Sequence, residues 1–180
     1  MHKIETPIAG AFVIEPKVFG DDRGYFYESF NRDKFVALGI TDDFVQDNHS
    51  ASQQGVLRGM HFQTAPRQMS KLVRCTRGRL FDVVADMRRD SPSFGKWYGV
   101  ELDAIDKRML YVPAGCAHGF YALTDCELLY KCGHSTFSPE HDAGFTWDDP
   151  DFAIDWPLSG PPTLSARDQA QPRFAELTAT

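Results

Sequence analysis

The chain has 180 residues, of which 42% are hydrophobic and 24% charged, and this composition excludes disordered and collagen-like classes. Its 25 acidic and 19 basic residues give a formal charge of −6, which argues against nucleic acid or an anionic membrane as the main partner. The sequence has no apolar run of membrane-spanning length and no apolar leader. We therefore expect a cytoplasmic protein with one domain over residues 1–180.

Short strand patterns dominate the chain. In order, they cover residues 11–15, 25–30, 55–63, 71–75, 80–87, 96–102, 108–112, 119–123 and 127–132. Within residues 80–87 the face that carries Val83 and Ala85 is the more apolar one, and we expect it to face the core. Gly78 can adopt the positive φ of a bulged hairpin, so residues 71–75 and 80–87 are predicted to pair as a β-hairpin.

Helical patterns are few and short. Residues 31–39 form one, with Asn31 able to cap its start and Gly39 its end. Ser165 and Asp168 have the spacing of a capping box and predict a second short helix, which Pro172 limits. The fold class is therefore all-β, a sandwich or barrel with a few short peripheral helices.

Residues 113–120 read Pro-Ala-Gly-Cys-Ala-His-Gly-Phe, a tight turn that presents His118 at the start of a strand. The segment resembles the second motif of the cupin superfamily, whose metal-binding members take further ligands from an upstream His-x-His and a nearby acid. Here the upstream segment reads His61-Phe62-Gln63 and is followed by Lys71. Because zinc and iron prefer several imidazoles and hard metals prefer carboxylates, we expect no metal and no other cofactor.

Further segments, in order, resemble the dTDP-4-dehydrorhamnose 3,5-epimerase family from about residue 5 to residue 173. They are residues 22–30 (DRGYFYESF), 46–50 (QDNHS), 55–63 (GVLRGMHFQ), 71–75 (KLVRC), 91–95 (SPSFG), 129–131 (LYK) and 147–150 (WDDP). The resemblance implies a metal-free cupin jelly-roll barrel, usually a homodimer whose partner strand contributes to each site. It also implies a nucleotide-diphosphate sugar as substrate, a dTDP-4-keto-6-deoxyhexose inverted at C3 and C5.

The same resemblance implies roles for individual residues. His61 would be the base, Tyr130 the proton donor on the opposite face of the sugar, and Asp168 the carboxylate that orients His61. Lys71 is a candidate for stabilising the enolate. Contacts to the ligand would come from Arg23, Glu28, Gln46, Asn48, Arg58, His118 and Arg167.

The chemistry suits these residue types. A proton next to a ketone is weakly acidic, so its removal needs a base with a pKa near neutrality, which histidine provides. Tyr130 shares a strand face with Leu128 and Cys132, and this face should line the barrel interior. The alternation around His61 would turn Arg58 outward, unless Gly59 marks a bulge that turns it back.

Other interpretations stay open at the sequence level. A single inward histidine or tyrosine is more often a packed core residue, and Asp168 could serve only as a helix cap. The loop at residues 133–139 is one residue longer than the family pattern and has Phe137 in place of a tyrosine, while Asp142 replaces a glutamate. An epimerase acting at C3 or C5 alone, or a noncatalytic cupin that binds a sugar nucleotide, is therefore an alternative. A metal-dependent cupin oxygenase or isomerase is disfavoured by Gln63 and Lys71.

Overall fold

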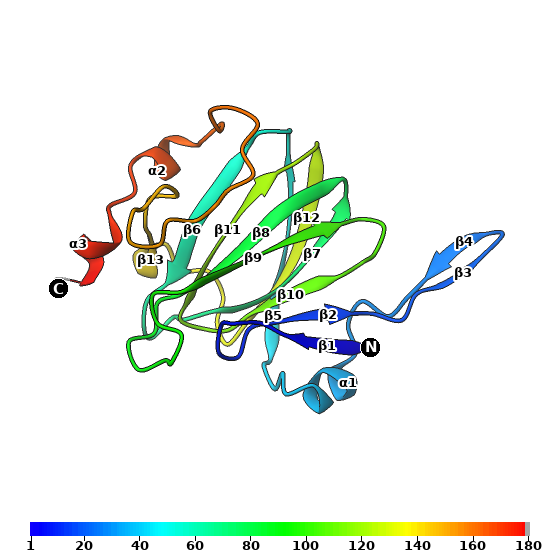
Figure 1. Ribbon diagram of the computed structural model, residues 1–180. Helices are drawn as coiled ribbons and strands as arrows, with labels where there is room; N and C mark the ends of the chain where they lie inside the picture. Colours follow the sequence, from blue (N-terminus) through cyan, green and yellow to red (C-terminus); the bar gives the residue numbers. More distant parts are fainter. Residues whose placement is uncertain (179–180) are drawn as a thin grey trace.

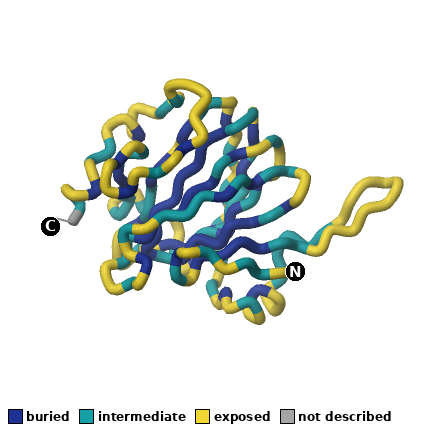
Figure 2. Tube along the Cα trace, viewed as in Figure 1, coloured by how far each residue is buried: buried dark blue, intermediate teal, exposed yellow. Residues whose placement is uncertain are grey.

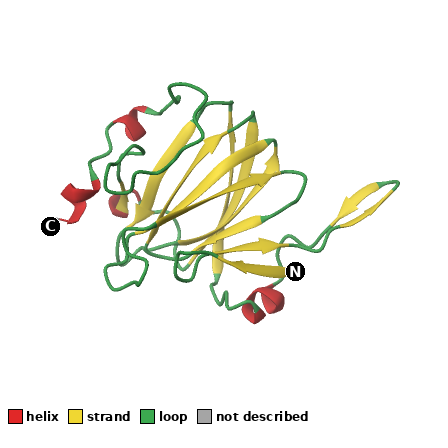
Figure 3. Cartoon of the chain, viewed as in Figure 1, coloured by secondary structure: helices red, strands yellow, loops and turns green. Residues whose placement is uncertain are grey.

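The computed structural model describes residues 1–178, in which two antiparallel sheets form a jelly-roll barrel (Figure 1). Strands make up most of the regular structure and the helices are short and peripheral (Figure 3), so the predicted all-β class is confirmed. The six-stranded sheet has the order β1 (His2–Glu5), β2 (Phe12–Glu15), β10 (Met109–Val112), β7 (Ser70–Arg77), β12 (Cys126–Gly133) and β5 (Phe44–Ser52). The five-stranded sheet has the order β13 (Asp142–Gly144), β6 (Leu57–Gln63), β11 (Cys116–Ala122), β8 (Arg79–Asp86) and β9 (Trp97–Asp103).

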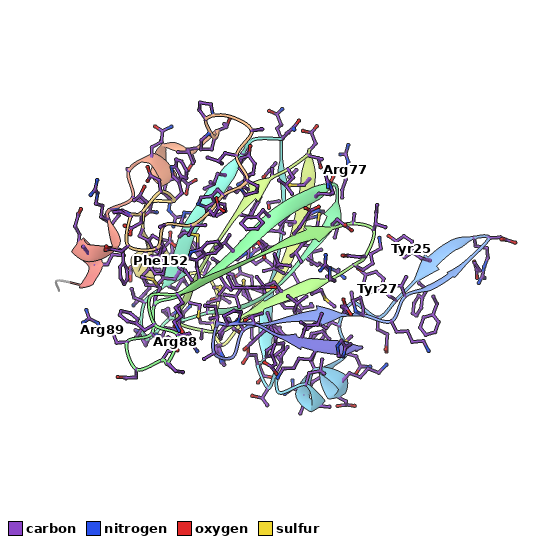
Figure 4. The ribbon with its side chains drawn as sticks, in the orientation of Figure 1. Tyr25, Tyr27, Arg77, Arg88, Arg89 and Phe152 are labelled. Atoms are coloured by element: carbon purple, nitrogen blue, oxygen red, sulfur yellow. The ribbon has the colours of Figure 1, made fainter. Side chains whose placement is uncertain are left out.

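Both faces of the five-stranded sheet are buried. Its inner face, with Leu80 and Val84, joins an apolar cluster inside the barrel. Its outer face, with Val83 and Ala85, packs against the C-terminal segment, where Phe152 lies against the sheet (Figure 4). The more apolar face of residues 80–87 therefore points away from the barrel interior, because the C-terminal segment supplies a second core that strand periodicity alone does not reveal.

The predicted hairpin between residues 71–75 and 80–87 is wrong. Strand β7 pairs with β10 and β12, whereas β8 pairs with β11 and β9, so these consecutive strands lie in opposite sheets. Gly78 has the expected positive φ of 71°. A Cβ at this position would lie 2.0 Å from the carbonyl oxygen of Asp125, so the glycine permits a tight corner where the chain crosses between sheets.

The helices begin where their caps predict. Helix α1 (Arg32–Ala37) starts after Asn31, whose side chain accepts a hydrogen bond from the Lys34 amide. Helix α2 (Ala166–Gln169) starts after Ser165 in the same way. The sequence pattern missed the short helices η1 (Pro139–His141) and α3 (Phe174–Thr178). None of the helices within residues 1–178 has the length and apolar character to cross a membrane.

A two-stranded hairpin, β3 (Phe19–Asp21) and β4 (Gly24–Phe26), projects from the barrel (Figure 1). All of its residues are exposed (Figure 2). The exposed fractions of Phe19, Tyr25 and Phe26 are 53%, 62% and 67%. The predicted strand at residues 25–30 therefore contributes only its first two residues to a hairpin outside the barrel. Exposed aromatic side chains on a projecting hairpin are typical of a contact surface.

Candidate active site

A cleft of about 500 Å³ opens into the barrel and is lined by both sheets and by the segment around α2. The five-stranded sheet contributes His61 and His118, and the six-stranded sheet contributes Lys71 and Tyr130. A second cavity of about 330 Å³ shares His61, Lys71, Tyr130 and Arg167 with the first. These shared residues therefore stand where the two cavities meet.

A bulge in β6 turns both Arg58 and His61 toward the cleft. His61 lies opposite His118 on β11 and Arg58 lies opposite Phe120, so two residues of β6 face one residue of β11 between these pairs. Gly59 has a φ of 133°, and a Cβ there would approach the Cα of Gly119 to 2.5 Å. The bulge considered from the sequence is confirmed, and glycine is required at its centre.

His61 and Asp168 form a close pair at the wall of the cleft. The Nε2 atom of His61 lies 2.7 Å from Oδ1 of Asp168, which is within ion-pair distance. The angle between the two groups does not meet the geometry of a regular hydrogen bond. Burial opposes ionisation of Asp168, but its contacts with His61 and Ser165 outweigh this effect and keep the pKa of the carboxyl below its usual value. Asp168 is therefore a buried carboxylate facing the imidazole.

Asp168 also takes part in the N-terminal cap of α2, where it forms two hydrogen bonds with Ser165. Its amide donates to the Ser165 hydroxyl oxygen at 3.1 Å, and the Ser165 hydroxyl donates to Oδ2 of Asp168 at 2.6 Å. The two carboxylate oxygens thus have separate partners, because Oδ1 faces His61. Capping and facing the histidine are compatible, and the cap fixes the carboxylate relative to the cleft.

Tyr130 enters the cleft from the sheet opposite to that of His61, on the inward face predicted from its alternation. Burial raises the pKa of its phenol, which is therefore protonated at neutral pH. The Nζ atom of Lys71 lies 5.9 Å from the centre of the Tyr130 ring. Burial lowers the pKa of Lys71.

A second histidine and carboxylate pair lies beside the first. Nε2 of His118 is 2.8 Å from Oδ1 of Asp82, and both side chains are buried. Burial lowers the pKa of His118 despite the charge of Asp82. The sequence reasoning did not select Asp82, although alternation with Leu80 and Val84 placed it on one strand face, where a buried acid requires a partner.

The candidate ligand contacts fall into two groups. Arg58, His118 and Arg167 line the larger cavity, and Gln46 and Asn48 line the smaller one. The guanidinium of Arg58 donates to the Ser52 hydroxyl at 3.1 Å and to the Ala51 carbonyl at 2.9 Å, while Arg167 forms an ion pair with Asp142.

Arg23 and Glu28 do not reach either cavity in this chain. Arg23 lies on the projecting hairpin, paired with Asp21 at 2.5 Å. Glu28 forms an ion pair with Lys34 and accepts a hydrogen bond from the side-chain amide of Asn31 at 3.0 Å, near the start of α1. Within residues 1–178, no group of three or more His, Cys, Asp and Glu side chains is arranged to hold a metal ion.

Comparisons with known proteins agree on one family. The family model described as dTDP-4-dehydrorhamnose 3,5-epimerase matches residues 5–176. The protein of that name from Salmonella typhimurium is 48% identical over 182 residues, covering 100% of this chain and 99% of its own. The one from Escherichia coli (strain K12) is 50% identical over 94% of this chain and 92% of its own.

Solved structures show the same likeness. An epimerase from Legionella pneumophila in complex with dTDP-4-keto-L-rhamnose has a TM-score of 0.94 at 45% identity and covers 99% of this chain and 95% of its own. ChmJ, a 3'-monoepimerase from Streptomyces bikiniensis in complex with dTDP-quinovose, has a TM-score of 0.90 at 35% identity and covers 98% of this chain and 89% of its own. Similar folds thus include enzymes described as acting at two centres and at one.

Proposed function

Because the chain belongs to the dTDP-4-dehydrorhamnose 3,5-epimerase family, we propose that it inverts C3 and C5 of dTDP-4-keto-6-deoxy-D-glucose to give dTDP-4-keto-L-rhamnose. The observation that carries this proposal is that His61 and Tyr130 line one cleft from opposite sheets. A hexose ring between them would meet a base on one face and an acid on the other. Inversion at a carbon requires this arrangement, because the proton must leave one face and return to the other.

His61 acts as the base. The carboxylate of Asp168 faces Nε2, which favours the tautomer with its proton on that nitrogen and leaves Nδ1 to accept a proton from the substrate. The carbon next to the C4 ketone loses its proton to Nδ1. The electron pair of that C–H bond forms the C=C bond of an enolate, and the negative charge moves to the C4 oxygen.

Lys71 and Tyr130 complete the step. The ammonium of Lys71 stabilises the enolate oxygen, and the partial burial of this side chain strengthens the interaction by reducing competition from water. The phenol of Tyr130 then delivers its proton to the opposite face of the carbon and restores the ketone. Solvent takes the proton from the His61 imidazolium and reprotonates the phenolate. The same sequence at the second carbon completes the double inversion.

The nucleotide is held by cations and amides around the cleft. Arg58 and Arg167 offer planar guanidinium groups that match phosphate oxygens, and Gln46 and Asn48 supply donors beside them. Arg23 and Glu28 act from a second copy of the chain in a homodimer. This assignment is supported by the exposed aromatic hairpin that carries Arg23 away from its own barrel.

Inversion at one centre is the second candidate. It is favoured by the similarity to the monoepimerase ChmJ and by the loop at residues 133–139, which places Phe137 in the smaller cavity. Incubation with dTDP-4-keto-6-deoxy-D-glucose in deuterium oxide distinguishes the two. Deuterium together with inverted configuration at both C3 and C5, read by nuclear magnetic resonance, is expected for double inversion. Inversion with deuterium at one carbon alone would establish the monoepimerase, and no deuterium at either carbon would exclude an epimerase on this substrate.

A further inference from the structure

Gln63 is buried at the end of β6, two residues after His61, and is 5% exposed. Its Nε2 donates to the carbonyl oxygen of Arg67 at 2.9 Å. Its Oε1 accepts a hydrogen bond from the backbone amide of Ser138 at 2.6 Å. The two ends of one buried amide therefore connect two separate loops, and neither end is assigned a role in the mechanism above.

The loop of residues 134–138, here called the Phe137 loop, has further attachments. Gln46 accepts a hydrogen bond from the backbone amide of Phe137 at 3.0 Å. The guanidinium of Arg67 donates to the carbonyl and hydroxyl oxygens of Thr136 at 3.3 and 3.0 Å. Among these attachments, Gln63 supplies the one from a buried side chain of the five-stranded sheet.

The Phe137 loop contributes a wall to the smaller cavity. Phe137 is 49% exposed, yet it lines this cavity together with His61, Lys71, Tyr130 and Gln63 itself. An aromatic ring that is half exposed gains buried area when a ligand covers it, so its position affects binding affinity. A wall on a loop contributes in this way only when rigid neighbours hold it in place.

We propose that Gln63 is a positioning residue for substrate binding, which acts by holding Phe137 as the wall of the smaller cavity. The inference rests on the proposed function and extends it, because it concerns affinity rather than proton transfer. His61, Asp168 and Tyr130 are held by β6, α2 and β12. Loosening the Phe137 loop should therefore weaken binding while the chemical step continues.

The direct test is a double-mutant cycle of Gln63→Met and Phe137→Ala. Methionine has nearly the length of glutamine but removes both hydrogen bonds, which leaves the Ser138 amide and the Arg67 carbonyl without this partner. The probe is dTDP-glucose, which carries both the nucleotide and a hexose but lacks the ketone and is not turned over. Calorimetry measures its dissociation constant for the wild type, both single variants and the double variant.

Each single variant is expected to raise the dissociation constant by about five- to tenfold, and the double variant by no more than the larger single effect. The KM for the keto sugar should rise in parallel while kcat changes by less than about twofold. Gln54→Met, at an exposed position, is the matched control and should bind like the wild type. Arg67→Ala releases the same loop from its outer side and should reproduce the loss if Gln63→Met does not fold.

The outcomes separate the two proposals. The role of Gln63 would be overturned if the dissociation constant of the double variant rises by the product of the two single effects. Wild-type affinity in Gln63→Met would also overturn it, even if turnover is normal. Absence of turnover in the wild type would overturn the proposed function, while the dissociation constants for dTDP-glucose would still decide the role of Gln63. A wild type that does not bind dTDP-glucose would overturn both.

Discussion

His61 and Asp168 meet at 2.7 Å, although one lies on a barrel strand and the other on a short helix near the C-terminus. The barrel therefore supplies the imidazole, and the segment that covers its outer face returns to supply the carboxylate. Asp168 also caps its own helix through Ser165, so its orientation is fixed from both sides.

Replacing Asp168 with asparagine should lower the rate of deuterium exchange at both carbons, on the order of 10²-fold. The amide keeps the shape of the carboxyl but removes the charge that stabilises the protonated imidazole. The loss should appear in kcat with little change in the affinity for thymidine diphosphate, as measured by calorimetry. Ser165→Ala, which removes the helix cap and one hydrogen bond to the carboxylate but keeps its charge opposite His61, is the comparison and should cost less. Equal rates for Asp168→Asn and the wild type would assign Asp168 to capping alone.

Replacing Tyr130 with phenylalanine should separate exchange from inversion. His61 would still remove the proton and return a deuteron to the same face, so exchange continues while inverted product forms about 10²- to 10⁴-fold more slowly. Nuclear magnetic resonance in deuterium oxide follows both quantities in one sample. If exchange and inversion fall together, Tyr130 has a role in binding or packing instead.

The pKa of Asp86 predicts how stability depends on pH. Contacts with Arg88, Ser91 and Ser93 outweigh burial and lower the pKa of this carboxyl to about 2. Because the pKa is lowered in the folded state, its contribution is present above the unfolded pKa near 4 and is lost as pH falls toward 2. Asp86→Asn should lower the free energy of unfolding at neutral pH by about 1 to 2 kcal/mol.

Denaturant titrations between pH 2 and pH 7 measure this effect. The difference in unfolding free energy between the wild type and Asp86→Asn should shrink as pH falls below about 4. A difference that stays constant over this range would mean that packing, and not ionisation, accounts for the contribution of Asp86.

The proposed homodimer predicts complementation between two impaired variants. Arg23→Ala would damage the site of the partner, whereas His61→Ala would damage the site of its own chain. Coexpression in equal amounts produces mixed dimers with one intact site each, and activity should recover to about a quarter of the wild-type value at limiting substrate. Activity that stays at the average of the two separate variants would place both residues in one subunit's site.

Much of the site could be predicted from the sequence, because short stretches of neighbouring residues determine these features. Strand alternation placed Tyr130 on the inward face, and the unusual glycine at position 59 signalled the bulge that turns Arg58 and His61 into the cleft. The capping box at Ser165 predicted the start of α2 correctly. In each case a few neighbouring residues determine the conformation.

Features that depend on distant parts of the chain were not predictable in this way. The spacing around Gly78 is compatible with either a hairpin or a crossing between sheets, and only the pairing of the other strands decides between them. Strand β5 was missed because its polar residues have low strand propensity, although pairing with β12 stabilises it. The contact between Asp168 and His61 was expected from the family resemblance, since no spacing rule relates residues so far apart in sequence.

The central claim is that one base, His61, serves both carbons, and the most direct test is deuterium uptake by His61→Ala. The variant should bind thymidine diphosphate with near wild-type affinity by calorimetry, because the cations around the cleft remain. In deuterium oxide, dTDP-4-keto-6-deoxy-D-glucose should then keep its protons at both C3 and C5, whereas the wild type exchanges both. Uptake at the wild-type rate at either carbon in His61→Ala would contradict the account, because another group would then have to remove that proton.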